Sequence, residues 1–253
     1  MNLNNGILLI DKEQGITSRD VVNKAIKKFK NNKIGHTGTL DPLATGVLVL
    51  CIGNATKLVE MLTSLNKEYI AEFTFGVKTD TLDITGQVLE EKDAIIDKAN
   101  IETAIKKLIG TYEQTTPIYS AVKVNGKKLY EYARENIPVE LPKRTVTISS
   151  MELLDYQVID NKTTIKIKTT VSKGTYIRAI ANDLAEILNT IGIMTSLRRT
   201  KQGNFNIEDC INIDNASNED IINIKDILKE YKQVTLSDSE YLKIKDGQII
   251  YNI

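Results

Sequence analysis

Residues 35–46 read GHTGTLDPLATG, and this stretch decides the fold because it sets where a buried strand begins. It contains three glycines, a proline and the only histidine of the chain around one carboxylate, Asp41. Glycine allows the backbone to turn tightly or to approach a ligand, and Pro42 disfavours helical geometry at the preceding Asp41. The stretch therefore predicts a rigid loop that presents Asp41 directly before a buried strand over 47–53.

A carboxylate on such a support suits a nucleophile or a general base, because a fixed position lowers the entropic cost of attack. The same residues also fit an Asp that caps its own turn, and His36 fits a loop histidine with structural partners. A phosphate-binding loop is a further interpretation, although neither the Walker spacing nor a G-x-G-x-x-G pattern is present. The loop by itself leaves these alternatives open.

The composition narrows the class of protein. The chain has 253 residues, of which 42% are hydrophobic and 26% are charged, as in an ordinary globular protein with a sizeable core. No apolar run has the length of a membrane span, and the first 15 residues lack the apolar segment of a secretory signal, so we expect a cytoplasmic protein without a membrane partner. One histidine and two distant cysteines argue against a zinc site and against a serine–histidine triad.

The charges cancel overall but are unevenly distributed along the chain. Residues 162–203 carry eight basic side chains against two acidic ones, and residues 118–145 carry six against three. If the two segments meet, they form a cationic face of the kind that binds a polyphosphate partner. A solvated lysine-rich surface is the alternative interpretation.

The pattern of apolar residues predicts an α+β protein. Its periodicity indicates strands over 7–10, 67–77, 151–158 and 163–171, and helices over 18–29, 54–65, 100–110 and about 177–188. Ser18 is the expected cap of the first helix and Asn54 that of the second. Because strands and helices do not alternate strictly, we expect a mixed, largely antiparallel sheet flanked by helices. Residues 114–144 are polar and basic, hold three of the four prolines, and read as a loosely packed insertion.

Two further stretches carry chemistry. In SKGTYIR, residues 172–178, Lys173 and Gly174 precede a helix start, a place that attracts anions. Arg178 follows near that start, where its guanidinium could reach back to a carboxylate. In KEYIA, Tyr69 is either a stacking surface for a ligand or a half-buried strand tyrosine.

Together these stretches resemble the bacterial tRNA pseudouridine(55) synthase B family. The resemblance rests, in order, on the runs GHTGTLDPLATGVL, KEYIA, GVKTDTLDITG, SAVKVNGKKLYEYAR, SKGTYIR with DL at 183–184, and SLRRTKQGNF, and it covers about residues 6–205. It implies a pseudouridine-synthase fold and an isomerase that detaches a uracil from its ribose and rejoins it through carbon, at the T-loop uridine (uridine-55) of tRNA. Neither a cofactor nor a metal is implied. The alternative is a non-catalytic tRNA-elbow-binding or RNA-folding protein of the same fold.

The resemblance also assigns roles to residues. Asp41 matches the catalytic aspartate, and whether it attacks the sugar or the base, or removes a sugar proton, stays open. Arg178 matches the arginine that pairs with that carboxylate, and Tyr69 matches the tyrosine that stacks on the extruded base. The expected substrate-binding residues are thus His36, Tyr69, Tyr176, Arg178 and Leu197, of which His36 would contact the RNA as the nucleotide leaves its stack.

The same resemblance divides the chain into two expected domains. Residues 1–234 form the catalytic domain with the insertion 114–144 as a thumb over the RNA, and residues 235–253 form a short remnant of a PUA-like RNA-binding domain. Such a remnant is too short for a core of its own, so we expect weaker or narrower RNA binding with catalysis retained. Glu13 and Ala185 depart from the family pattern outside the proposed chemistry. The expected partner is the T-stem-loop of tRNA, bound by a monomer.

Overall fold

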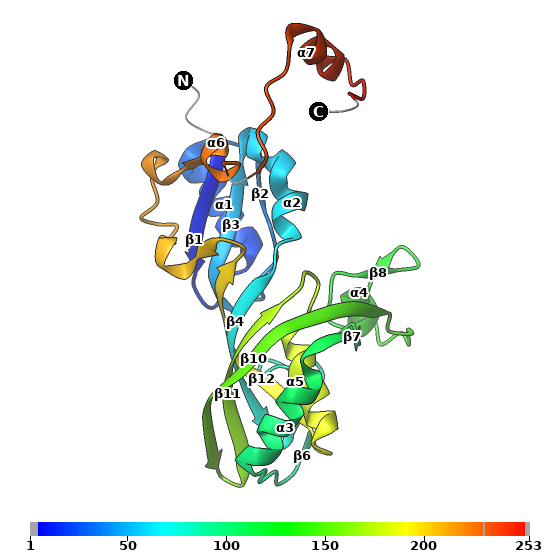
Figure 1. Ribbon diagram of the computed structural model, residues 1–253. Coiled ribbons are helices and arrows are strands. Elements are labelled where there is room, and N and C mark those ends of the chain that lie inside the picture. Colours follow the sequence, from blue (N-terminus) through cyan, green and yellow to red (C-terminus); the bar gives the residue numbers. More distant parts are fainter. Residues whose placement is uncertain (1–4, 230, 251–253) are drawn as a thin grey trace.

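A long mixed β-sheet with helices packed against it forms the body of the protein (Figure 1). The computed structural model describes residues 5–229 and 231–250. The strand order is β14-β1-β3-β12-β4-β11-β10-β7, with β2 beside β3 and β13 beside β12. Among the strand pairs of this sheet in those residues, only β12 with β3 is parallel. The α+β class and the mixed, largely antiparallel sheet are confirmed.

The elements have the following bounds. The strands of the sheet are β1 (Gly6–Lys12), β2 (Ile34–His36), β3 (Thr45–Ile52), β4 (Lys67–Phe75), β7 (Gly110–Thr115), β10 (Lys143–Ile159), β11 (Lys162–Val171), β12 (Gly192–Gln202), β13 (Phe205–Asn206) and β14 (Ile222–Asn223). Two ribbons pair β5 (Val77–Thr79) with β6 (Val88–Glu91) and β8 (Lys123–Val124) with β9 (Lys127–Lys128). The α-helices are α1 (Ser18–Phe29), α2 (Val59–Thr63), α3 (Lys98–Leu108), α4 (Leu129–Arg134), α5 (Ile177–Ile187), α6 (Ile224–Ile227) and α7 (Asp238–Lys245), and the 3₁₀ turns are η1 (Gly53–Leu58), η2 (Ile207–Asp209) and η3 (Asn218–Asp220).

The strand after the opening loop is buried on both faces. Alternate residues of β3 enter two different hydrophobic clusters: Leu48 and Leu50 belong to the larger one, and Val47 and Val49 to the smaller one. A strand covered on both faces reads as a continuous apolar run, and this explains the sequence VLVLCI. The prediction of a buried strand directly after Asp41 is confirmed.

The first helix has the predicted bounds but a different cap. Thr17, and not Ser18, is the N-cap residue, and it forms a capping box with Asp20. The Ser18 hydroxyl instead donates to the Leu40 carbonyl (3.0 Å) and accepts from the Leu40 N–H (2.8 Å). The predicted cap at Ser18 is therefore wrong, because this hydroxyl holds the loop that carries Asp41.

The predicted helix over 54–65 is also wrong in its extent. Residues 53–58 form a 3₁₀ turn without a side-chain cap, so Asn54 caps no helix, and only α2 that follows is α-helical. The other predictions are closer. The strand β4 buries every second residue, and α3 begins two residues before the predicted Asn100. The predicted hairpin is longer than expected, because β10 and β11 extend to Ile159 and Lys162 around the turn at Asp160 and Asn161, which both have positive φ.

The two halves of the sheet meet where β3 and β12 run in parallel over two residues, Thr45–Gly46 beside Arg198–Arg199. Gly46 has φ +100°, and a Cβ there would lie 2.1 Å from the Arg199 carbonyl oxygen. Only glycine fits this approach, because any side chain would push β12 away. The last glycine of the opening stretch therefore permits the junction of the two halves.

The predicted insertion 114–144 starts inside β7 and ends inside β10, and its central part carries β8, β9 and α4. The expected loose packing is wrong for its first residues, because Gln114, Thr116 and Ser120 are buried. At the other end of the chain, α7 stands apart from the sheet (Figure 1). The last residues of the predicted C-terminal remnant, 251–253, lie outside the described residues.

Candidate active site

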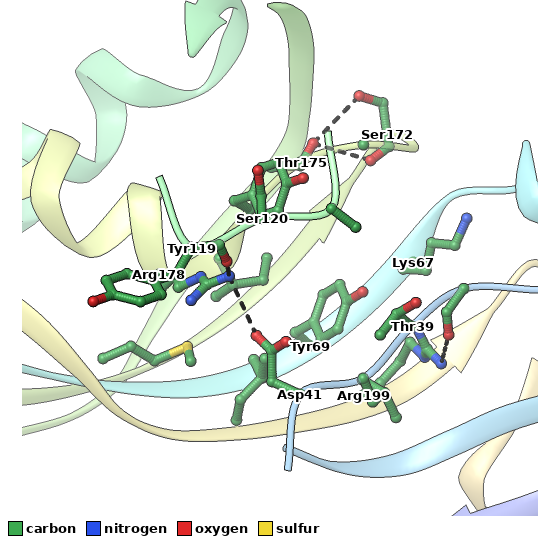
Figure 2. Close-up of a pocket in the computed structure, with 18 of the residues that line it drawn as sticks. Thr39, Asp41, Lys67, Tyr69, Tyr119, Ser120, Ser172, Thr175, Arg178 and Arg199 are labelled. Atoms are coloured by element: carbon green, nitrogen blue, oxygen red, sulfur yellow. Dashed lines mark hydrogen bonds and ion pairs between the residues drawn. The ribbon is translucent and has the colours of Figure 1, made fainter. Parts of the chain in front are cut away.

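A pocket of about 450 Å³ lies at the junction of the two halves of the sheet. Five of the six predicted site residues line it: Asp41, Tyr69, Tyr176, Arg178 and Leu197. Figure 2 labels three of them, Asp41, Tyr69 and Arg178. They come from the opening loop, β4, the start of α5 and β12, which are far apart in the sequence. The volume is within the range of pockets that hold a small molecule or a single nucleotide.

The loop around Asp41 is held on both sides. Before it, Leu40 is bonded at both its N–H and its carbonyl by the Ser18 hydroxyl. After it, the Pro42 carbonyl accepts from the Gly15 N–H (2.8 Å), and the Asp41 carbonyl accepts from the Ala44 N–H (3.0 Å). The Asp41 side chain is 42% exposed, so a rigid backbone presents a carboxylate that a substrate can reach.

Arg178 connects that carboxylate to a second one. Its Nη2 lies 3.8 Å from Asp41 Oδ2, and its Nη1 lies 3.7 Å from Asp83 Oδ2. Nη2 also donates to the Tyr119 carbonyl at 2.6 Å, and Nη1 donates to the Thr81 carbonyl at 3.4 Å. Two carboxylates and two backbone carbonyls therefore fix the guanidinium. As predicted, the Arg178 side chain reaches back from the start of α5 to a carboxylate.

Asp83 was missed as a site residue by the sequence reasoning. Its side chain is only 6% exposed, and its Oδ1 accepts from the hydroxyls of Thr81 (2.9 Å) and Thr85 (2.5 Å) and from the Thr85 N–H (2.9 Å). The stretch TDTLDITG alternates Thr and Asp in a way that favours such side-chain bonded turns. That pattern shows a turn, but it does not show that one carboxylate of the turn faces Arg178.

The start of α5 is held by β7. The Gln114 side chain is fully buried; its Oε1 accepts from the Tyr176 N–H (2.8 Å) and its Nε2 donates to the Tyr176 carbonyl (3.3 Å). Nε2 also donates to the Tyr112 hydroxyl, which in turn donates to Asp183 (2.7 Å), two turns further along α5. Burial raises the pKa of Asp183 above its usual value, and burial beside Asp183 raises the pKa of Tyr112. The strand thus fixes the helix that carries Arg178.

Aromatic and apolar side chains form the rest of the pocket wall. Tyr69 and Leu197 lie on the adjacent strands β4 and β12, and Figure 2 shows Tyr69 beside Asp41. The Tyr176 ring has the guanidinium of Arg144 at 5.7 Å and that of Arg178 at 5.9 Å from its centre. The rings of Tyr69 and Tyr176, which line the pocket that holds Asp41, offer stacking surfaces to a planar base.

His36 is the predicted site residue that the structure does not bring into the pocket lining. It is half-buried at the end of β2, and its Nδ1 accepts a long bond (3.4 Å) from the Gly38 N–H. Burial and the positive charges of Arg19 and Arg199 lower the pKa of His36 below its ordinary value. The imidazole is therefore neutral at pH 7, and its contact with RNA stays a prediction.

Three basic side chains that the sequence reasoning did not select are buried around the same loop. Lys67 and Arg199 line the pocket, and Lys12 donates to the backbone carbonyls of Glu13 (2.8 Å) and Ile16 (2.7 Å). Burial lowers the pKa of Lys12 to about 8, although the charge of Asp41 acts in the opposite direction. The sequence did not indicate these residues because they lie at inward-facing positions of β1, β4 and β12. Periodicity shows that such a position is buried, but it does not show which groups surround the side chain.

Two other observations concern the described residues alone. No three His, Cys, Asp or Glu side chains in them lie close enough together to hold a metal ion. None of the helices in residues 5–229 and 231–250 has the length and apolar character needed to cross a membrane.

The comparisons with known proteins define the class. The sequence model described as "TruB family pseudouridylate synthase (N terminal domain)" matches residues 26–177, more than half of the chain. The chain therefore belongs to the TruB family of pseudouridylate synthases, whose members are isomerases. This confirms the family resemblance and the enzyme class expected from the motifs.

Individual relatives carry a more particular name. The tRNA pseudouridine synthase B of Caldicellulosiruptor saccharolyticus is 45% identical over 243 residues, which cover 96% of this chain and 82% of that protein. The tRNA pseudouridine synthase B of Fusobacterium nucleatum is 48% identical over 203 residues, covering 80% of this chain and 69% of that protein. Among solved structures, a chain of a Cbf5-Nop10-Gar1 complex matches with a TM-score of 0.64 and 25% identity; the match covers 98% of this chain and 58% of that one. The fold is that of the pseudouridine synthases.

Proposed function

We propose that the protein converts a uridine in the T-loop of tRNA, uridine-55, to pseudouridine, with Asp41 as the catalytic carboxylate. The N1–C1′ glycosidic bond breaks, a C5–C1′ bond forms, the hydrogen leaves C5 for solvent, and N1 gains a proton. The reaction is a rearrangement without a change of redox state. The names of relatives that are 45% and 48% identical support tRNA as the substrate.

One observation carries the proposal. Asp41, on a rigid loop, lies 3.8 Å from the fixed guanidinium of Arg178 inside a pocket of nucleotide size. The guanidinium supplies a fixed positive charge beside the carboxylate at the place where a bound substrate would react. Tyr69 offers a stacking face beside it, and a base must leave its stack before it reaches a pocket of this kind.

We also propose that the protein works as a monomer on the T-stem-loop, in the cytoplasm. The fold of one chain already brings Asp41, Tyr69 and Arg178 to the same pocket. Analytical ultracentrifugation with and without RNA gives the stoichiometry, and a two-fold assembly that is required for turnover would contradict the monomer.

Tritium release tests the activity. The protein is incubated with a T-arm RNA that carries tritium at uracil C5, and label in the solvent is counted. The wild type releases tritium, and Asp41→Asn, which keeps the shape of the side chain, lowers the rate at least about 10²-fold. Binding without release by the wild type would instead indicate a non-catalytic RNA-binding protein of the same fold.

A further inference from the structure

Two buried cations line the pocket on the side of Tyr69 that faces away from Arg178 (Figure 2). Lys67 is 6% exposed and Arg199 is 1% exposed. Among the residues that the structure describes, neither forms an ion pair with a carboxylate. The pocket is therefore divided into a part with the Asp41–Arg178 pair and a part with unbalanced positive charge.

Neutral backbone carbonyls hold both cations in place. Lys67 Nζ donates to the Thr63 carbonyl and to the Leu65 carbonyl (2.6 Å). Arg199 donates from Nε to the Val47 carbonyl (2.6 Å) and from Nη2 to the Gly38 carbonyl (3.1 Å). These bonds orient the groups but leave their charge, and an ammonium with two acceptors retains a third N–H.

Such an arrangement is costly without an anion. A buried cation that lacks an opposite charge destabilises the folded protein, and proteins pair such groups or place them where a charged ligand binds. Burial, with the nearby charges of Arg199 and Lys173, lowers the pKa of Lys67 to about 8, so the ammonium is still mostly charged at pH 7. An anion beside Lys67 would offset this shift, because a nearby negative charge favours the charged ammonium.

The strand geometry places the cations relative to the base. Lys67 and Tyr69 are two residues apart and therefore lie on the same buried face of β4, about 7 Å from each other along the strand. Arg199 pairs with Tyr69 across β4 and β12. A nucleotide with its base on Tyr69 thus has its sugar and one backbone phosphate within reach of Lys67.

We propose that Lys67, with the charge of Arg199 behind it, binds a backbone phosphate next to the nucleotide that enters the pocket. This site rests on the proposed RNA substrate and adds an anion contact to it. The phosphate is the one on the 5′ or on the 3′ side of the target uridine, and both sides present the same chemistry to an ammonium. The contact anchors the sugar–phosphate backbone while the base lies beside Asp41.

A pairing of protein and RNA changes tests the contact. T-stem-loop RNAs with one uncharged methylphosphonate linkage, either 5′ or 3′ of the target uridine, are compared with unmodified RNA by equilibrium binding. Lys67→Gln keeps N–H donors for the carbonyls but removes the charge. It weakens binding of unmodified RNA about tenfold, and the methylphosphonate at one of the two linkages weakens wild-type binding by a similar factor. The two changes combined weaken binding no more than either does alone.

Two further variants serve as controls. Lys67→Arg retains the charge and restores most of the affinity, whereas Lys98→Gln, which removes an exposed lysine of α3, changes affinity less than twofold. Unchanged affinity in Lys67→Gln, or losses that multiply at both linkages, would overturn the site. Tritium release by the wild type decides the proposed activity separately. If binding depends on Lys67 and on one linkage but no tritium is released, the phosphate site is supported and the proposed activity is overturned. If tritium is released but Lys67→Gln binds RNA with unchanged affinity, the activity is supported and the phosphate site is overturned.

Discussion

Arg178 is shared by two carboxylates that differ in exposure. Asp83 is buried and fixed by two hydroxyls and a backbone N–H, so it anchors the guanidinium. Asp41 is partly exposed and faces the pocket, so it remains accessible to a substrate. The buried pair thus fixes the position of the positive charge, and the exposed partner is available for chemistry.

Removing the guanidinium separates catalysis from binding. Arg178→Ala lowers the rate of tritium release at least about 10²-fold and changes the dissociation constant for T-arm RNA less than about threefold, because the charge beside Asp41 is lost while the RNA surface remains. It also lowers the free energy of unfolding by about 3–5 kcal/mol, since Asp83 is left buried without its partner. Adding Asp83→Asn restores part of the stability and none of the activity. Equal losses in rate and in affinity would contradict these roles.

At the scale of elements, β7 fixes the start of α5. The single side chain of Gln114 bonds both backbone groups of Tyr176, which has no side-chain cap of its own. The same strand leads into the segment that supplies the Tyr119 carbonyl to Arg178. The helix and its guanidinium are therefore positioned by one stretch of chain.

A matched pair of variants tests this positioning. Gln114→Met removes the bonds to Tyr176, lowers the rate of tritium release about tenfold at unchanged RNA affinity, and speeds hydrogen exchange of the Tyr176 amide. Thr163→Val is the control, because the buried Thr163 hydroxyl also bonds one carbonyl and one N–H, those of Ala94 and Ile96, away from the pocket. Thr163→Val lowers the free energy of unfolding by a similar amount and changes the rate of tritium release less than about twofold. Equal rates for the two variants would show that Gln114 has only a structural role.

Periodicity predicted most elements, and its failures have local causes. The alternation from Tyr69 to Phe75 and the stripe of α5 depend on one buried face, which the sequence shows directly. Ser18 was assigned as a cap because a serine before an apolar stripe fits that role, whereas its hydroxyl bonds Leu40, 22 residues away. Contacts between distant segments, such as those of Ser18 and Gln114, leave no spacing that a single sequence reveals.

At the scale of the whole molecule, the pocket exists because two halves of one sheet meet at Gly46. The family resemblance named Asp41, Tyr69, Tyr176, Arg178 and Leu197, and the fold brings these five together. Asp83, Lys67 and Arg199 could not be selected in the same way, because their burial follows from contacts between distant segments: Arg199 lies beside β3, Lys67 pairs with Gln202 and Asp83 with Met194 of β12. Sequence motifs therefore indicated the chemistry, and the charges that support it required the structure.

The thumb segment gives a prediction at this scale. Lys127 and Lys128 lie over the rings of Tyr132 and Tyr130, at 5.1 Å and 5.3 Å from the ring centres, which holds both cations on one short ribbon. If they contact phosphates, the double substitution Lys127→Ala and Lys128→Ala weakens RNA binding. It also makes the fall of the logarithm of the association constant with the logarithm of salt concentration shallower, by about one to two units of slope. Filter binding at about 50 to 200 mM salt measures this slope. A weakened affinity with an unchanged slope would remove these lysines from the RNA contact.

The proposed role of Asp41, which acts on a uracil extruded from the T-loop, is checked by a structure of the Asp41→Asn variant with a T-stem-loop bound. We expect the target uracil out of its stack, with its ring against Tyr69 and its glycosidic bond beside the side chain at position 41. A T-loop whose target base stays stacked, or a base that enters the pocket with position 41 facing away, would contradict this role of Asp41.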